Sequence, residues 1–487
     1  MYNLCSKSLA AIIGLATLPF LGGCAGDVVD LDTLAHQQLL QSDREDGARY
    51  IGQTIRIDLT EALDRAIAKN LDARVAEMDL VVQEGNATIK QLEILPQVKT
   101  TRTTMVRSNL GASSSQSVES GLQSLEPSQS SDRRRLTSEM EASWNLLDSG
   151  LALAETYRMQ DETGIARERY TKVIQNIERD VYAAYWQAWE YQKLKAGNKD
   201  VLEKADQQIR NLNNAIDKNL LSTDEGSDKI SEIEDRKRNL QDLDQSLSSA
   251  EIELKTLLSY PQSANLELVS PPEIKANIKT LLNGNIRDQE WTALQSRSEL
   301  REEVLQKNIA IKNVRQEIFK TLPGVNVLMS YNADSNSFLQ DNQWSSMSLG
   351  VTQNLLNTLT LPLRFAAAKT KEHQSDARRK ALGVALIAQV HLARQRLSQT
   401  QDNCTDAKHA AKNALKKAYT KSAKSKAGFA AGEEKLVSEL DGRISTVRQS
   451  LTCSDMQDSY AAMVNSLGQN LDHQTLLASN GGGQNGQ

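Results

Sequence analysis

Two short stretches, ILPQVKT (residues 94–100) and TLPGVNV (residues 321–327), decide how the chain folds. In each of them a leucine–proline pair ends a helical pattern, and residues of alternating polarity follow. Proline disfavours the helical backbone conformation for the residue before it, and β-branched residues favour strands. Each stretch therefore predicts the point at which a helix gives way to a strand.

A second pair of matching phrases lies downstream of the first. WNLLDSG (residues 144–150) corresponds to QNLLNTL (residues 353–359), with Asn145 aligned to Asn354. The first copy is the longer one, and its surplus falls in a Ser-rich segment (residues 108–132) that is typical of an exposed loop. The order predicts two tandem copies of one unit, each running helix, strand, loop, strand, long helix, turn, helix.

Each copy contains a long helical stretch, over residues 153–218 and residues 363–428. Each helix would be roughly 100 Å long at 1.5 Å per residue, far beyond an ordinary globular helix. Turns are expected around Asn219 and Gly432, because asparagine and glycine tolerate positive φ. In the second stretch small residues recur at spacings of three and four, which predicts a seam for close helix packing. This seam consists of Cys404, Ala407, Ala411, Ala414 and Ala418.

The composition excludes several classes of protein. The chain has 487 residues, of which 24% are charged and 4% aromatic, its formal net charge is −5, and its five histidines are scattered. The sequence contains no zinc-type cysteine spacing, nucleophile elbow or phosphate-binding loop. We therefore expect no catalytic residue, no metal site, no enzyme activity and no cofactor other than a covalent lipid. The basic run DRRR (residues 132–135) is interpreted as a loop or membrane-rim patch rather than a nucleic-acid site.

A short apolar run near the N-terminus ends in PFLGGCAGD (residues 19–27). The run covers residues 9–21, which is shorter than the roughly 20 residues that a membrane-spanning helix needs, and a lysine precedes it. This pattern is typical of a cleaved secretory signal peptide, residues 1–23. The alternative is a buried first helix.

The residues Leu21-Gly22-Gly23-Cys24 resemble the lipobox of bacterial lipoproteins. That resemblance implies a diacylated Cys24 that becomes the mature N-terminus. The residue that follows, Ala25, favours the outer membrane over the inner membrane in that family. Two acyl chains anchor a protein stably, because each buried methylene contributes roughly 0.8 kcal/mol.

The order and duplication of these phrases resemble the TolC-like family of bacterial outer-membrane efflux proteins, over about residues 55–470. The resemblance lies in the opening LTEALDRAIAKN (residues 59–70), the two Leu-Pro junctions, both Asn-Leu-Leu phrases and the closing SYAAMVNSLGQ (residues 459–469). The lipobox suits the lipoprotein subgroup of that family.

The resemblance implies a mainly α fold with some β structure, assembled as a homotrimer. Each chain would give four strands to a twelve-stranded β-barrel in the outer membrane, and the long helices would continue it as a tunnel across the periplasm. The edges of isolated hairpins carry unpaired backbone groups that lipid does not tolerate, which agrees with closure between chains. The implied function is the exit duct of a tripartite efflux or type I secretion system. Such a duct conducts cargo passively from an inner-membrane pump and docks to a periplasmic adaptor protein; a drug, a metal ion and a polypeptide all stay open as cargo.

A second function stays open, a periplasmic coiled-coil lipoprotein that acts as a scaffold or adaptor without a pore. Long helices suit this function as well, and the strand after Pro96 offers few apolar residues beyond Val98, Met105 and Val106. A duct predicts heat-modifiable trimers and single-channel conductance, whereas a scaffold predicts neither.

The phrase Val437-Ser438-Glu439-Leu440-Asp441 resembles the acidic phrase at the family's periplasmic entrance, with Ser438 in place of one acidic residue. The resemblance implies that Asp441, Ser438 and Glu439 line an aperture, and a solvated helix face is the alternative. The two hairpin turns are expected to contact the adaptor. Their residues are Asn219, Leu220, Leu221, Ser222, Gly432, Glu433 and Glu434.

The midpoint between Cys404 and Cys453 lies beside the second predicted turn, so an antiparallel hairpin places the two cysteines at the same height. A disulfide between them needs Cα atoms within about 4.4–6.8 Å. Two alternatives stay open: a disulfide that limits how far the hairpin can splay, or two buried free thiols.

These observations predict six segments. They are residues 1–23 (signal peptide), 24–54 (lipidated extension), 55–260 (first repeat, with a β-hairpin over 97–148), 261–285 (irregular equatorial linker), 286–470 (second repeat, with a β-hairpin over 324–358) and 471–487 (disordered tail).

Overall fold

The computed structural model describes residue 41, residue 50 and residues 52–272, 275–426 and 432–471. The predicted signal peptide, the lipid-attachment residue Cys24, most of the extension that follows it and the tail after residue 471 lie outside the described residues. The chain divides into two compact units, Met1–Gln53 and Thr54–Gln487. The architecture below is that of the second unit.

Helices dominate this unit, and a few strands accompany them. The helices are α2 (Leu59–Lys69), α3 (Leu71–Leu92), α4 (Leu146–Asp217), α5 (Thr223–Leu257), α6 (Lys275–Asn283), α7 (Ile286–Ser296), α8 (Ser298–Phe319), α9 (Leu355–Lys426) and α10 (Gly432–Ser466). The strands are β1 (Thr54–Ile57), β2 (Gln97–Val106), β3 (Ala112–Ser113), β4 (Ser128–Gln129), β5 (Arg134–Asn145), β6 (Asn265–Leu268), β7 (Gly324–Asp334) and β8 (Gln343–Thr352).

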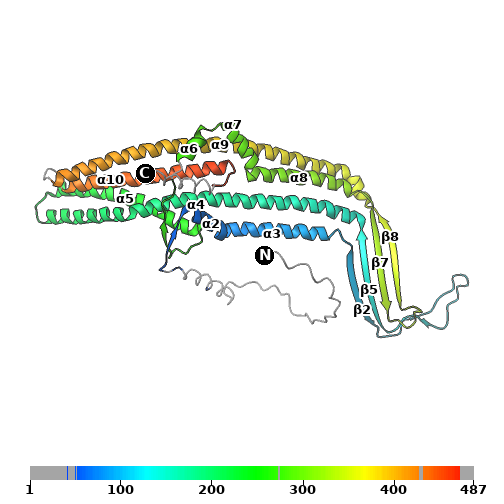
Figure 1. Ribbon diagram of the computed structural model, residues 1–487. Coiled ribbons are helices and arrows are strands. Elements are labelled where there is room, and N and C mark those ends of the chain that lie inside the picture. The colour runs from blue at the N-terminus through cyan, green and yellow to red at the C-terminus, as the bar shows by residue number, and fades with distance from the viewer. Residues whose placement is uncertain (1–40, 42–49, 51, 273–274, 427–431, 472–487) are drawn as a thin grey trace, which may run out of the picture. The chain divides into compact units, whose positions relative to one another are not determined.

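The elements follow one another in two series of matching lengths. α3 and α8 each have 22 residues, α4 and α9 each have 72, and α5 and α10 each have 35. A helix of 72 residues spans roughly 108 Å. α3 and α5 pack along α4, and α8 and α10 pack along α9, so each long helix is flanked by two shorter ones (Figure 1).

Four long strands form one sheet in the order β2-β5-β7-β8, and every neighbouring pair is antiparallel. The sheet extends from the end of the helices at which α4 and α9 begin (Figure 1). The pairing of β5 with β7 joins the two series of elements. β2 and β8 are therefore the outer strands, and each is paired on one side only.

An asparagine marks the change from strand to helix in both series. The side chain of Asn145 accepts hydrogen bonds from the backbone N–H groups of Leu147 and Asp148. The side chain of Asn354 likewise accepts from the N–H groups of Leu356 at 3.1 Å and Asn357 at 3.4 Å. Because the first turn of a helix leaves backbone N–H groups without partners, such a cap fixes the start of the helix. This explains physically why the Asn-Leu-Leu phrase occurs twice.

Two buried clusters hold the helices together. One joins α4, α5 and α10 at the end far from the sheet. Its α5 members Ile233, Leu240 and Leu247 are fully buried and lie seven residues apart, the spacing of a coiled-coil seam. The other cluster is built around Tyr182 and Tyr185 of α4 and joins this helix to α2, α5 and α10.

The segment between the two series differs from the prediction. The sequence predicts an irregular linker over residues 261–285, but β6 and α6 occupy much of it. β6 pairs in parallel with β1, and its alternation buries Leu266 and Leu268. The hydroxyl of Tyr185 donates to the carbonyl oxygens of Ile57 and Val269 at 3.0 and 2.7 Å. These contacts hold the short sheet against α4, which explains why so few residues form a stable strand pair.

The helix α9 begins earlier than the sequence predicts. Its first residue is Leu355, so that Pro362 lies inside the helix, although a proline removes one backbone hydrogen bond there. As a separate observation, none of the described helices combines the length and the apolar character of a membrane-spanning helix.

Truncating the heptad seam of α5 should destabilise the helical end of the molecule. Leu240 is fully buried, so Leu240→Ala should lower the free energy of unfolding by about 2–5 kcal/mol, the range for such a cavity. Leu125→Ala is the matched control, because Leu125 is 97% exposed. Loss of helical circular dichroism on heating measures both variants, and an equal melting temperature for Leu240→Ala and the wild type would contradict the packing described.

Candidate functional site

The strand register sorts the residues of the four-stranded sheet onto two chemically different faces. Residues opposite one another in neighbouring strands share a face, and Val98, Ala142, Met329 and Met347 stand in one such row. The rows around it are also apolar, except for Thr100 and Ser345 on the side away from the helices. The apolar face consists of Val98, Met140, Ala142, Trp144, Val325, Val327, Met329, Tyr331, Met347, Leu349 and Val351.

The opposite face of the sheet is polar, apart from Met105, Leu328 and Trp344. Its side chains bond to one another across strands, as Ser330 does with Ser346 at 2.7 Å. Polar members of this face are Gln97, Lys99, Thr101, Thr103, Arg135, Thr137, Glu139, Glu141, Ser143, Asn326, Ser330, Asn332, Asp334, Ser346, Ser348 and Thr352. Such alternation is typical of strands that have lipid on one side and water on the other.

At the other end of the helices, α10 is tied to the first series by ion pairs. Three of its carboxylates each contact a basic residue of α4 or α5. The pairs are Glu433–Lys229 (2.6 Å), Glu439–Lys204 (3.1 Å) and Asp441–Arg236 (3.0 Å). All six side chains are 22–48% exposed, so each pair contributes little alone, roughly 0–1 kcal/mol. Together they fix the position of α10 along α4 and α5.

Ion pairs at this end of the helices shift the pKa values of a lysine and a glutamate. Hydrogen bonds to Asp200 and Glu439 raise the pKa of Lys204. Within the second hairpin, the hydrogen bond from Lys421 of α9 lowers the pKa of Glu434 of α10. These partners therefore stabilise the charged forms of Lys204 and Glu434.

The three residues predicted to line an aperture do not share one environment. Glu439 and Asp441 are partly exposed and paired, as described above. Ser438 is only 5% exposed, and its hydroxyl has no hydrogen-bond partner in the part of the chain that the structure describes. Ser438 differs from the expectation because its side of α10 is packed against neighbouring helices instead of facing solvent.

The turn between α4 and α5 holds four of the residues predicted to contact an adaptor. Asn219 has a φ of 54°, a left-handed conformation that asparagine tolerates. Leu220 is 77% exposed, whereas Leu221 packs against the buried cluster of α4, α5 and α10. Ser222 caps α5 by accepting a hydrogen bond from the N–H of Glu225 at 3.2 Å. The turn thus presents one apolar side chain on a well-capped helix end.

The second predicted turn is described only in part. α10 begins at Gly432, and residues 427–431 before it lie outside the described residues. Glu433 and Glu434 are in the first turn of α10, where carboxylates interact favourably with the helix dipole.

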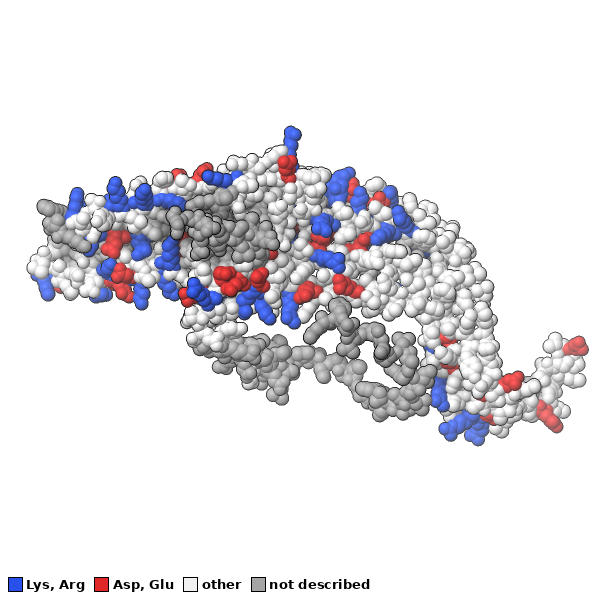
Figure 2. All heavy atoms as spheres, viewed as in Figure 1, with Lys and Arg blue, Asp and Glu red and all other residues white. Residues whose placement is uncertain are grey.

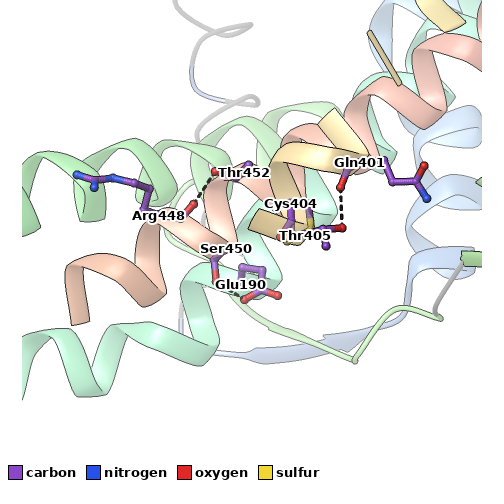
Figure 3. The surroundings of a disulfide bond; sticks show 8 residues. Glu190, Gln401, Cys404, Thr405, Arg448, Ser450 and Thr452 are labelled. Atoms are coloured by element: carbon purple, nitrogen blue, oxygen red, sulfur yellow. Dashed lines mark hydrogen bonds between the residues drawn. A yellow bond between two sulfur atoms is a disulfide. The ribbon is translucent and has the colours of Figure 1, made fainter. Parts of the chain in front are cut away.

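Cys404 of α9 and Cys453 of α10 form a disulfide with a Cα–Cα distance of 4.8 Å (Figure 3). Close by, the hydroxyl of Ser450 donates to Glu190 of α4 at 2.8 Å. At this level α10 is therefore held covalently to α9 and by a hydrogen bond to α4. The disulfide closes a loop between residues that are 49 positions apart. The chain entropy that this loop removes from the unfolded state corresponds to about 4 kcal/mol.

Sequence reasoning missed two features of these surfaces. The ion pairs of α10 join residues more than 200 positions apart, and no local pattern indicates them. The apolar face of the sheet depends on the register among four strands. Among the described residues, no group of three or more His, Cys, Asp or Glu side chains could hold a metal ion.

The comparison with known proteins rests on solved structures, because no family model and no curated protein sequence matches the chain. The outer membrane protein VceC from Vibrio cholerae is similar, with a TM-score of 0.61 at 13% identity, over 85% of this chain and 97% of that chain. The open state of the Neisseria gonorrhoeae MtrE outer membrane channel gives a TM-score of 0.64 at 13% identity, over 85% and 89%. The Campylobacter jejuni CmeC outer membrane channel gives a TM-score of 0.63 at 10% identity, over 87% of this chain and 88% of that chain. The chain has the fold of these outer-membrane channels, in agreement with the resemblance to the TolC-like family.

Proteolysis without reductant should release one linked pair of peptides that contain Cys404 and Cys453. Cys453→Ser should lower the free energy of unfolding by about 4 kcal/mol, because the unfolded chain regains the entropy of the open loop. Thr452→Ala is the control, since the hydroxyl of Thr452 donates to the carbonyl oxygen of Arg448 within its own helix. Mass spectrometry checks the linkage, and two separate peptides from the unreduced protein would contradict it.

The ion pair between Lys421 and Glu434 should make a contribution to the stability of the folded state that depends on pH. Because the folded pKa of Glu434 is lowered from 4.5, its contribution is complete above pH 4.5 and is lost as the pH falls through the lowered value. The difference in melting temperature between the wild type and Lys421→Gln should therefore shrink in acid. Lys412→Gln, an exposed residue of the same helix, is the control. A difference that stays constant down to acid pH would refute this assignment.

Proposed function

We propose that the chain is the protomer of an outer-membrane exit duct, assembled as a homotrimer with a twelve-stranded β-barrel and a helical periplasmic tunnel. The duct would conduct cargo passively from an inner-membrane pump, as part of a tripartite efflux or type I secretion system. The observation that carries the proposal is the sheet, which is apolar on one face, polar on the other and unpaired at both edges.

Closure between chains follows from the direction of the strands. Each strand of the order β2-β5-β7-β8 is antiparallel to its neighbour, so β2 and β8 run in opposite directions. β8 of one chain can therefore pair with β2 of the next in an antiparallel ladder, and the pattern repeats until the ring closes. Three chains give twelve strands, with the apolar face toward lipid and the polar face toward a water-filled lumen.

The helices next to the outer strands support the same closure. α3, which precedes β2, exposes an apolar stripe whose members are three, four or, once, seven residues apart. Its members are Leu71, Val75, Met78, Val82, Ile89 and Leu92, each 52–70% exposed. α9, which follows β8, exposes Leu363, Val384 and Leu392. A second copy of the chain paired along the sheet edge would cover these apolar residues as well, as in a coiled coil.

The remaining assignments belong to the same proposal. Cys24 would carry the lipid after removal of residues 1–23, and the two series of elements would be tandem copies of one unit. The turn at Asn219–Ser222 and the start of α10 at Gly432 would dock to the periplasmic adaptor. Glu439 and Asp441 would lie near the periplasmic entrance and repel anions there.

Two substitutions on adjacent residues of β8 should separate a pore from a non-pore scaffold. Met347 is on the apolar face, midway between Val351 and Gln343. A lysine there would face the middle of the bilayer, which costs about 2–4 kcal/mol. Ser348 is on the polar face, so Ser348→Lys should still assemble and should shift the pore toward anion selectivity.

Gel mobility before and after heating measures the trimer, and single-channel recording in a planar bilayer measures the pore. We expect both signals from the wild type and from Ser348→Lys, and a loss of trimer from Met347→Lys. A wild-type chain that gives neither trimer nor conductance would instead support the scaffold function.

A further inference from the structure

The apolar face of the sheet becomes basic at its far rim. In register, Arg102 of β2 lies opposite Ser138 of β5, and Arg134 of β5 lies opposite Val106 of β2. This pairing places both arginines on the face that carries Met140, since residues two apart in a strand share a face. Both guanidinium groups belong to exposed residues. Figure 2 shows Lys and Arg gathered at this end of the sheet.

The positions of Arg102 and Arg134 along the strands correspond to the boundary between the apolar part of a membrane and its headgroups. Arg102, Ser138, Ala333 and Gln343 form one row. Gln343 is eight residues from Val351, the last apolar residue of β8 on the helical side, which corresponds to roughly 27 Å along the strand. Because barrel strands are tilted by about 40°, this length covers about 20 Å of height. The apolar band of an outer-membrane barrel is about 25 Å tall. Arg134 is opposite Val106, four residues beyond Arg102, which adds about 10 Å of height, so the upper limit of the band lies between the two arginines.

The charges of the sheet are segregated by face. The carboxylates Glu139, Glu141 and Asp334 all belong to the polar face. Arg135, next to Arg134 in sequence, also faces that side and pairs with Asp334 at 3.3 Å. Arg102 and Arg134, by contrast, make no ion pair with any described residue, and their own face offers no carboxylate in the neighbouring strands.

Two further arginines stand at the ends of the same strands. The N–H of Arg107 donates to the carbonyl oxygen of Arg133 at 2.8 Å, and the guanidinium of Arg133 donates to the carbonyl oxygen of Ser108 at 2.8 Å. These hydrogen bonds hold the ends of β2 and β5 together. The guanidinium groups of Arg107 and Arg133 add positive charge at the strand end that also carries Arg134. The sequence DRRR thus supplies charge to both faces of the sheet, and its middle arginine belongs to the lipid side.

We propose that Arg102 and Arg134 bind the phosphate groups of lipid headgroups at the far rim of the sheet. Guanidinium groups bind phosphate through two parallel hydrogen bonds, and basic residues near an anionic lipid surface contribute roughly 1 kcal/mol each. Headgroup phosphates lie immediately beyond the apolar part of a bilayer, and the levels of Arg102 and Arg134 lie on either side of that limit. The inference rests on the proposed function, because it requires the sheet to span the membrane.

Spin-labelled lipids measure the preference directly. The full chain is reconstituted into phosphatidylcholine bilayers with spin-labelled phosphatidic acid or spin-labelled phosphatidylcholine, and the two association constants are compared. Each arginine should favour the phosphomonoester about fivefold, so Arg102→Gln with Arg134→Gln should bring the ratio close to one. Lys412→Gln with Lys416→Gln removes the same charge from exposed residues of α9 and should leave the ratio unchanged.

The outcomes separate this inference from the proposed function. Three outcomes would overturn headgroup binding. The ratio of association constants could stay unchanged in the arginine variant, or it could fall equally in the lysine variant. Inorganic phosphate could also abolish the preference for phosphatidic acid in the wild type. Trimer mobility and conductance are recorded on the same samples. If both are intact while the wild-type ratio is one, only the lipid inference fails. If the wild type gives neither trimer nor pore, both proposals fail together.

Discussion

The backbone N–H and C=O groups along the free sides of β2 and β8 are the constraint on which the remaining structure depends. Each strand has ten residues and a neighbour on one side only, and an unsatisfied backbone group is costly wherever water is absent. The chain passes directly from α3 into β2 and from β8 into α9. The uncovered strand edges therefore continue into uncovered helix faces, and one neighbouring molecule can satisfy both.

The two series of elements are joined at both ends of the molecule by different physical means. At one end the ladder between β5 and β7 connects them through backbone hydrogen bonds. At the other end α10 packs on α4 and α5 as well as on α9. Buried leucines give that packing its stability, while partly exposed ion pairs set its register, because such pairs are specific in position but weak in energy. The helical end is thus joined by side-chain packing and ion pairs, and the sheet end by backbone hydrogen bonds.

The sequence indicates local features better than it indicates relations between distant segments. Pro96 and Pro323 stand directly before β2 and β7, because proline acts on its own neighbours. The apolar face shows how local reasoning falls short. β2 alone contributes only Val98 to it, and the face becomes apolar only when β5, β7 and β8 align with β2. The strand β6 was overlooked for a related reason, since its partner β1 lies some 200 residues earlier.

The disulfide divides the second helical hairpin into two mechanically different parts. From Cys404 to the end of α9 at Lys426 there are 22 residues, or roughly 33 Å of helix. Between the crosslink and Lys426, α9 and α10 are held to each other by non-covalent contacts such as the ion pair of Lys421 with Glu434, whereas at Cys404 a covalent bond sets their spacing. The crosslink therefore fixes the separation of the two helices at a point about one third of the length of α9 from its C-terminal end, and any change of spacing beyond that point is hinged on a covalent link.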